Sequence, residues 1–122
     1  MLKELLLVGT GSFIGGATRY LVSSFVSSFG SGFPWGTFII NFIGCLLIGF
    51  LWGLTSRFPN FPPQLSLLLS VGFCGGFTTF STFAKENLLL LQTDNYTSFS
   101  LYVFGSVAIG VFAVMLGFTL TK

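Results

Sequence analysis

Long apolar runs alternate along the chain with short turns made of polar residues, glycine and proline. The runs cover about residues 3–29, 35–56, 64–92 and 98–121. A helix needs about 20 apolar residues to cross the hydrocarbon core of a bilayer, so each run is long enough to cross once. The pattern therefore predicts an all-α membrane protein in which residues 1–122 form one domain of four transmembrane helices.

The composition supports a membrane protein and narrows its possible partners. Hydrophobic residues make up 52% of the chain and charged residues only 7%, and the mean hydropathy is +0.91. Soluble domains carry about 25% charged residues. The first run lacks a small-residue cleavage site and is too long for a cleavable signal peptide. The net charge of +2 does not argue for a nucleic-acid partner.

The chain offers few residues for catalysis. It contains no histidine, and its two cysteines, Cys45 and Cys74, lie inside apolar runs. A cysteine in such a place behaves as a small hydrophobic residue. We therefore expect no disulfide, no metal cluster and no catalytic triad, and the chain is not expected to be an enzyme.

Positive charges are spread almost evenly over the two sides of the predicted bundle. Lys3, Arg57 and Lys122 fall on one side, whereas Arg19 and Lys85 lie in the helix halves that approach the other. Lysine and arginine near helix ends set the orientation of a membrane protein, and three against two is a weak bias. A chain with so weak a bias could insert in both directions.

Glycines at helical spacing indicate where helices approach one another closely. Gly11 and Gly15 are four apart in the first run, and Gly49 and Gly53 are four apart in the second. Small residues at this spacing let two helix backbones come together in a membrane. Each pair therefore predicts a close contact with another helix.

The third run contains a stretch, residues 72–83, that differs from its leucine-rich surroundings. Glycine, threonine and phenylalanine dominate it, and this composition weakens a helix. We therefore predict that the third helix is broken in mid-membrane between Gly75 and Thr78. Such a break would free carbonyl oxygens that suit a small cation such as sodium. The alternative is that Gly75 and Gly76 only permit close helix packing.

Polar residues inside the other runs fall on two helix faces. Asn41 follows Thr37 by one turn, and it can either join two helices by a hydrogen bond or offer donors to a pathway. Tyr102, Ser106 and Gly110 recur at steps of four and form a narrow stripe that carries hydrogen-bond donors. The alternative for Ser106 is a bond to the carbonyl of the preceding turn.

Two further groups have both a structural and a functional interpretation. Phe80 and Phe83 share a helix face, and their rings can pack or can turn weakly positive edges toward an anion. Arg19 can pair with an acid or attract anions to the mouth of a cavity. Glu86 follows these phenylalanines by one turn and can end a polar track.

Three motifs together resemble the fluoride channel (Fluc/CrcB) family. They are Gly75–Phe83 (GGFTTFSTF), Gly36–Gly44 (GTFIINFIG) and the pair Arg19-Tyr20. The resemblance covers the whole chain in length, number of spans and order of motifs. It implies a fluoride-selective channel through which cytoplasmic fluoride leaves the cell passively. It also implies an antiparallel, dual-topology homodimer with two pores, surrounded by the lipids of the bacterial inner membrane.

The resemblance also implies roles for individual residues. Backbone carbonyls of Gly75 and Thr78 from both subunits would hold a structural sodium ion at the dimer centre. The residues implied at the fluoride pore are Asn41, Phe80 and Phe83, with Thr37, Ser81, Tyr102 and Ser106 along a polar track, Glu86 near one end and Arg19 at a vestibule. The chain departs from the family at Gly110, where relatives often carry a hydroxyl.

Two other functions compete with this interpretation. A small proton-coupled exporter of cationic drugs or guanidinium would be similar in length and helix number. Such exporters carry a membrane-embedded glutamate in the first helix, whereas this chain has Arg19 there and Glu4 at the very end. A purely structural subunit would not need donors aligned on two helices together with a helix break.

Overall fold

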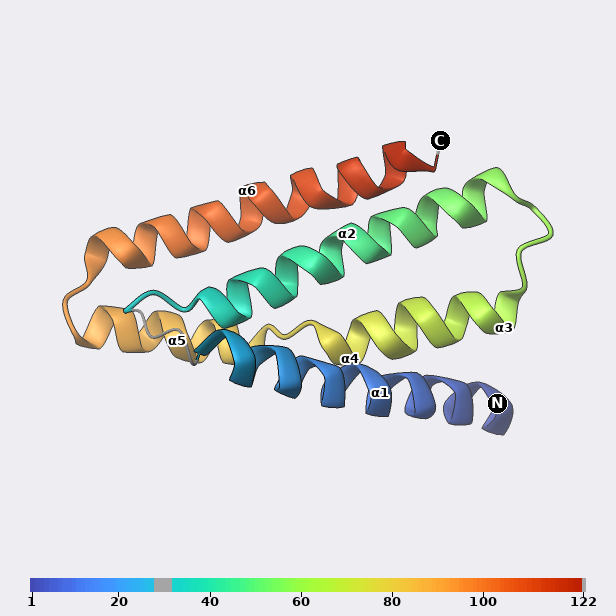
Figure 1. Cartoon of the computed structure of the whole chain (residues 1–122), viewed down its shortest axis with the longest axis horizontal. Coiled ribbons are helices and arrows are strands. Elements are labelled where there is room, and N and C mark those ends of the chain that lie inside the picture. The colour runs from blue at the N-terminus through green and yellow to red at the C-terminus, as the bar shows by residue number, and fades with distance from the viewer. Residues whose placement is uncertain (28–31, 122) are drawn as a thin grey trace.

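The computed structural model describes residues 1–27 and 32–121, which form a bundle of helices lying side by side (Figure 1). Four helical spans are long and apolar enough to cross a membrane: α1 (Leu2–Ser27), α2 (Trp35–Arg57), Pro63–Gln92 and α6 (Tyr96–Leu120). No strand occurs in the described ranges. The prediction of an all-α chain with four such helices is confirmed. The expected end of the first helix at Phe29, part of the following turn and Lys122 lie outside the described residues.

The spans run alternately up and down, so the two chain ends lie at the same end of the bundle (Figure 1). Pro63 occupies the first position of α3, where the missing N–H of proline costs nothing. Between the third span and α6, Asp94 adopts a left-handed conformation with φ of 61°. The N–H groups of Asp94 and Asn95 donate to the carbonyls of Leu91 and Leu90, at 3.2 and 2.9 Å, and so close the helix end.

The third span consists of several segments. They are α3 (Pro63–Ser66), a π-helical segment η1 (Leu67–Cys74), α4 (Gly75–Phe77) and α5 (Ser81–Gln92), with residues 78–80 outside any helix. Gly75 is helical, with φ −63° and ψ −36°, whereas Thr78 is extended, with φ −80° and ψ 160°. Of the break predicted between Gly75 and Thr78, the part from Gly75 to Phe77 is therefore wrong, and the chain leaves the helix only at Thr78. Helical geometry persists through Phe77, because the Thr78 N–H still donates to the Cys74 carbonyl at 3.0 Å.

Glycines bring the spans into close contact, as their spacing predicts. A Cβ atom on Gly11 would lie 2.9 Å from the Cα of Gly72, so α1 and η1 touch backbone to backbone. A Cβ on Gly15 would lie 3.0 Å from the backbone nitrogen of Phe77. Between α2 and α6, a Cβ on Gly53 would lie 2.9 Å from the Phe118 carbonyl. Any side chain at these positions would force the helices apart.

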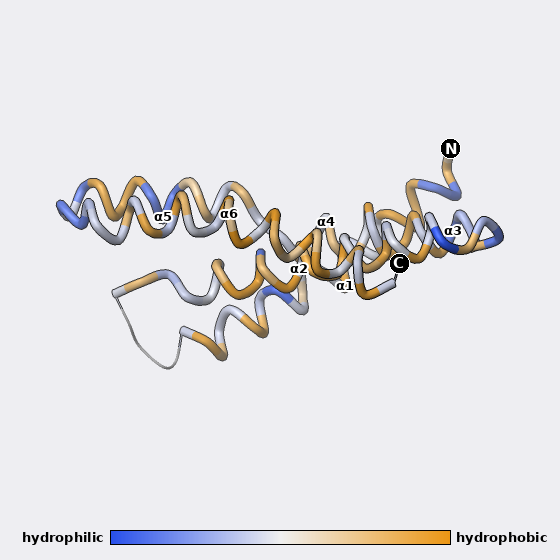
Figure 2. The backbone as a smooth tube through the Cα atoms, turned by 90° about the horizontal axis from the view of Figure 1, so that it is seen from above, coloured by the Kyte–Doolittle hydropathy of each residue, from blue (hydrophilic) through white to orange (hydrophobic). Residues whose placement is uncertain are grey.

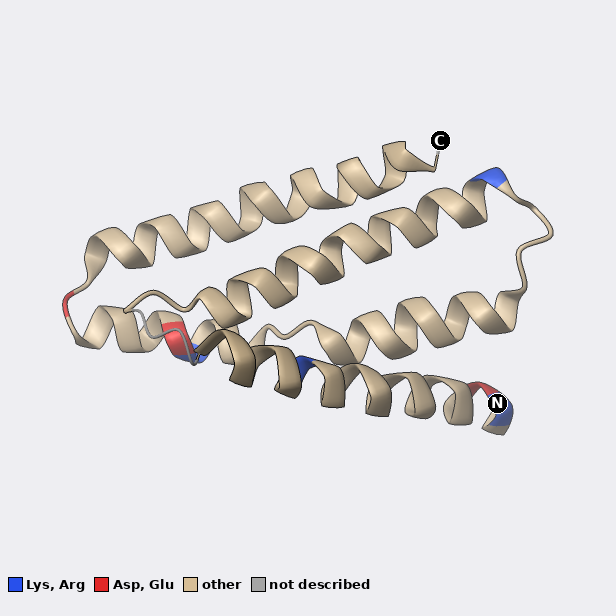
Figure 3. Cartoon of the chain, viewed as in Figure 1, with Lys and Arg blue, Asp and Glu red and all other residues tan. Residues whose placement is uncertain are grey.

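Polar segments gather at the two ends of the bundle, and apolar segments lie between them (Figure 2). Charged residues are likewise sparse along the helices (Figure 3). Large apolar side chains point outward from several helices, including Phe13 at 77% exposed and Phe104 at 73%. A soluble monomer does not expose so much apolar surface, so this surface fits contact with lipid or another chain.

Candidate functional site

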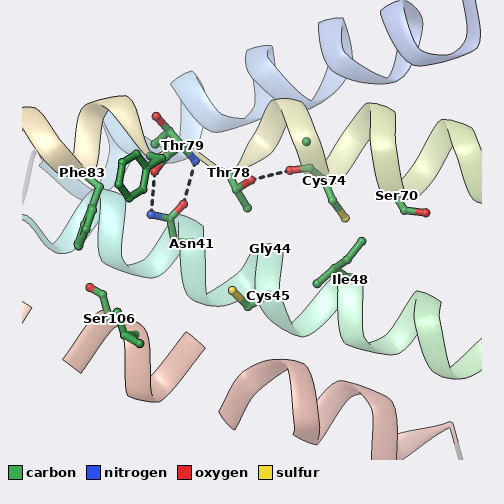
Figure 4. A pocket seen from close by; sticks show the side chains of 13 residues that line it. Asn41, Gly44, Cys45, Ile48, Ser70, Cys74, Thr78, Thr79, Phe83 and Ser106 are labelled. Carbon is green, nitrogen blue, oxygen red and sulfur yellow. Dashed lines mark hydrogen bonds between the residues drawn. The ribbon is translucent and has the colours of Figure 1, made fainter. Parts of the chain in front are cut away.

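A cavity of about 480 Å³, here the central cavity, lies between α2, the third span and α6 (Figure 4). Its lining includes six residues singled out from the sequence: Asn41, Gly75, Thr78, Phe80, Phe83 and Ser106. These residues come from three different spans and are separated by up to 65 positions, from Asn41 to Ser106. The fold therefore gathers most of the predicted site into one place.

Asn41 forms a pair of hydrogen bonds with the backbone of Thr79. The Asn41 amide nitrogen donates to the Thr79 carbonyl at 3.0 Å, and the Thr79 N–H donates to Asn41 Oδ1 at 2.9 Å (Figure 4). One side chain thus satisfies both polar groups of a non-helical residue, which is costly to leave unpaired inside a membrane. This is the interhelical role expected for Asn41, and the side chain also lines the central cavity.

The same pairing changes the environment of the Gly75 carbonyl. In a continuous α-helix the Thr79 N–H would donate to Gly75, four residues earlier, but here it donates to Asn41. Likewise, the Thr82 N–H donates to Thr79 Oγ1 at 3.3 Å, although a continuous helix would direct it to the Thr78 carbonyl. Both carbonyls predicted to bind a cation have therefore lost their normal helical donors. Gly75 also borders open space, since a Cβ there would have no neighbour within 4 Å.

Aromatic rings continue from the central cavity toward one end of the bundle. The ring centroids of Phe80 and Phe83 are 5.8 Å apart, and those of Phe83 and Tyr102 are 4.9 Å apart. Phe80 is 77% exposed, whereas Tyr102 is fully buried. The three rings thus form a continuous row that leads from an open surface into the interior.

A second cavity, here the end cavity, has a volume of about 440 Å³ and is lined by Thr37 and Glu86 among others. Thr37 Oγ1 donates to one carboxyl oxygen of Glu86 at 2.9 Å, and the Tyr102 hydroxyl donates to the other at 2.8 Å. Each carboxyl oxygen of Glu86 therefore accepts a hydrogen bond from a hydroxyl on a different span. Tyr102 therefore connects the row of rings to a polar cluster on the wall of the end cavity.

Two predicted residues lie apart from both cavities. Ser81 is exposed at the start of α5, and it lines neither the central nor the end cavity. Arg19 is half-buried in α1, and its Nε atom is buried with no hydrogen-bond partner among the described residues. The other predicted residues lie at the two cavities. Those that line a cavity are Thr37, Asn41, Gly75, Thr78, Phe80, Phe83, Glu86 and Ser106. Tyr102 contacts this group through its hydrogen bond to Glu86.

The sequence interpretation missed two residues that shape the site. Thr79 supplies the backbone that Asn41 binds, and its hydroxyl oxygen accepts the Thr82 N–H near the start of α5. Asn87 is buried, and its amide nitrogen donates to the Phe83 carbonyl at 2.9 Å. An asparagine one turn after Phe83 in a leucine-rich run is a signal that could have revealed this contact.

Four apolar spans, buried polar contacts and cavities between the spans define a small multi-pass integral membrane protein. The model of the family described as "CrcB-like protein, Camphor Resistance (CrcB)" matches residues 6–118. The chain therefore belongs to the CrcB-like family. This family consists of ion channels, and the chain is not an enzyme, as predicted.

Relatives from several bacteria are similar over almost their whole length. The chain is 45% identical to the fluoride-specific ion channel FluC of Phocaeicola vulgatus, over 99% of this chain and 100% of the relative. It is 47% identical to the protein of the same name from Bacteroides fragilis, over 95% and 94%. It is 44% identical to that from Chlorobaculum tepidum, over 100% and 97%.

Proposed function

We propose that this chain is a fluoride-selective channel that lets cytoplasmic fluoride leave a bacterial cell passively across its inner membrane. The observation that carries the proposal is the 45–47% identity, over nearly the full length, to relatives named fluoride-specific ion channels. The residues that the fold gathers around the two cavities supply a chemical reason for such an activity.

The pathway we propose runs from the central cavity, past Phe83 and Tyr102, to the end cavity. Fluoride is small and strongly hydrated, so a narrow path must replace its water with donors. Asn41, the Ser106 hydroxyl and the edges of phenyl rings offer such donors, whereas the Tyr102 hydroxyl donates to Glu86. No lysine or arginine lines either cavity among the described residues, which fits conduction because an ion must also leave its site.

The protein acts, in this proposal, as an antiparallel homodimer that contains two pores and lies among membrane lipids. The weak charge bias supports insertion in both directions, and the many exposed apolar side chains support contact with a second subunit as well as with lipid. A protease site placed at the N-terminus should be cleaved from both sides of the membrane in roughly equal amounts. Cleavage from one side only would contradict dual topology.

A sodium ion in this dimer would be held by the carbonyls of Gly75 and Thr78 from each subunit, where it would have a structural role. The diverted helical donors at both carbonyls support this proposal. Sodium also places positive charge near an anion pathway.

We expect the purified dimer to melt at a lower temperature when N-methylglucamine replaces sodium. A ligand present at about 100 times its dissociation constant stabilises the native state by about 2.7 kcal/mol. Asn41→Ala should lose part of this sodium-dependent shift, because the Thr79 N–H can then return to Gly75. The control Ser81→Ala, at an exposed position, should keep it. Equal melting temperatures in both cations would remove the support for a sodium site.

Fluoride export itself can be tested in cells. A bacterial strain that lacks its own fluoride exporters should grow at a higher fluoride concentration when it expresses this chain. A membrane-inserted chain that gives no protection would count against the proposal.

A further inference from the structure

A small cavity of about 20 Å³ lies between α2 and α6 and shares Asn41, Cys45 and Ser106 with the lining of the central cavity. Asn41 and Cys45 line it from α2, and Ser106 and Gly110 line it from α6. The rest of its wall is apolar. A cavity needs about 10–15 Å³ of probe volume and at least two polar partners to hold one water molecule. The volume is therefore sufficient for a single guest of that size.

The cavity contains a buried hydroxyl that has no partner. Ser106 Oγ is buried and makes no hydrogen bond with the described residues. The alternative expected from sequence, a bond to the carbonyl of the preceding turn, is thus not formed. A buried hydroxyl left unpaired costs about 1–3 kcal/mol, so a guest that pairs with it would be strongly favoured.

Two further groups on the wall can bind the same guest. The Asn41 amide nitrogen has two hydrogens, and the structure uses one of them on the Thr79 carbonyl. The Cys45 thiol is a weak donor and acceptor. Together with Ser106 Oγ they provide two or three polar contacts, which is typical of buried water.

Gly110 leaves the room for this guest. A Cβ on Gly110 would have a single neighbour within 4 Å, the Cys45 sulfur at 3.5 Å, which is an ordinary contact. By contrast, a Cβ on Gly117, further along α6, would lie 2.7 Å from the Phe50 nitrogen. Close helix packing therefore explains Gly117, but it does not explain Gly110.

We propose that this cavity holds one buried water molecule, bonded to Ser106 and Asn41, and that Gly110 leaves the space which an apolar side chain would take from the water. The water extends the row of donors along α6 by one turn, at a position where the chain itself has no polar side chain. This proposal concerns hydration of the folded chain and does not depend on fluoride transport.

A double-mutant cycle tests the proposal by thermal melting of the purified protein in detergent with sodium and without fluoride. Gly110→Ala should expel the water, leave Ser106 unpaired and lower the melting temperature by about 4 °C, the shift expected for a small domain that loses one such bond. In a Ser106→Ala background the same change should have almost no effect, because no hydroxyl is left to satisfy. Gly110→Ser should melt close to the unchanged protein, since its hydroxyl replaces the water.

The opposite results are equally specific. An equal loss from Gly110→Ala in both backgrounds would mean that the methyl group simply clashes, and no loss in either would mean that the cavity is empty. Both results overturn the proposal. A difference between Gly110→Ala and the unchanged protein that arises only when fluoride is added would assign the cavity to the ion instead of water. Because melting does not measure transport, none of these outcomes would contradict the proposed channel function.

Discussion

Replacing Phe83 with isoleucine should lower the rate of fluoride release from vesicles by about tenfold. If the ring edge lowers the free-energy barrier to ion passage by about 1.4 kcal/mol, its loss slows passage by that factor. Phe83 lines the central cavity and packs against Tyr102, whose hydroxyl donates to Glu86 on the wall of the end cavity. Isoleucine keeps the side chain apolar but has no ring edge to offer an anion. The dimer should remain intact, as measured by gel filtration.

The matched control for this change is Phe104→Ile. Phe104 is 73% exposed on α6, away from both cavities, so the same substitution should leave flux unchanged. Phe80→Ile should also lower flux, because its ring is the next in the row. If Phe83→Ile and Phe80→Ile both conduct like the unchanged protein, the rings only pack and do not line the pathway.

Gly49→Ala should lower the free energy of unfolding by about 3 kcal/mol. This value lies at the upper end of the usual cost of overpacking, because the added methyl group meets the rigid backbone of Val114. A Cβ on Gly49 would overlap the Val114 carbonyl oxygen and lie 2.8 Å from the Val114 Cα. The neighbours cannot move aside without separating α2 from α6. The melting temperature in detergent measures the loss.

Gly105→Ala is the control for this second prediction. Gly105 lies on α6 as well, yet a Cβ there would meet nothing within 4 Å. Alanine also favours the helix over glycine, so this variant should be at least as stable as the unchanged protein. Equal losses from Gly49→Ala and Gly105→Ala would show that helix propensity, and not close contact, determines the effect.

The spans and their glycine contacts could be predicted because both depend on local patterns. Apolar runs of sufficient length become membrane helices wherever they occur. Gly11 and Gly49 each sit in a small-residue step, and such steps favour close approach whichever helix provides the partner. The pattern does not predict which helix is the partner, and the structure shows η1 beside Gly11 and α6 beside Gly49.

The point at which the third span leaves its helix could not be read from composition alone. Glycine permits unusual backbone angles, and this placed the predicted break at Gly75, but the structure keeps Gly75 and Gly76 helical. A long-range contact decides the matter: Asn41, 38 residues before Thr79, binds both of its backbone groups. The π-helical segment before Gly75 likewise had no signature in the sequence.

The candidate site was predictable to a similar extent. Polar residues in a membrane helix are costly, so Asn41, Glu86 and Ser106 could be identified by their presence alone. The pairing of Glu86 with Thr37 and Tyr102 needed three spans to be placed in space. The motif resemblance linked these residues to fluoride, which neither spacing nor burial identifies.

Anion release from vesicles tests the fluoride selectivity of this protein most directly. Liposomes that contain the purified protein should release fluoride rapidly, and without a proton gradient, while chloride loaded at the same concentration stays almost entirely inside. Release of both ions at equal rates would contradict selectivity, and proton-driven uptake of a cationic dye would point to an exporter instead.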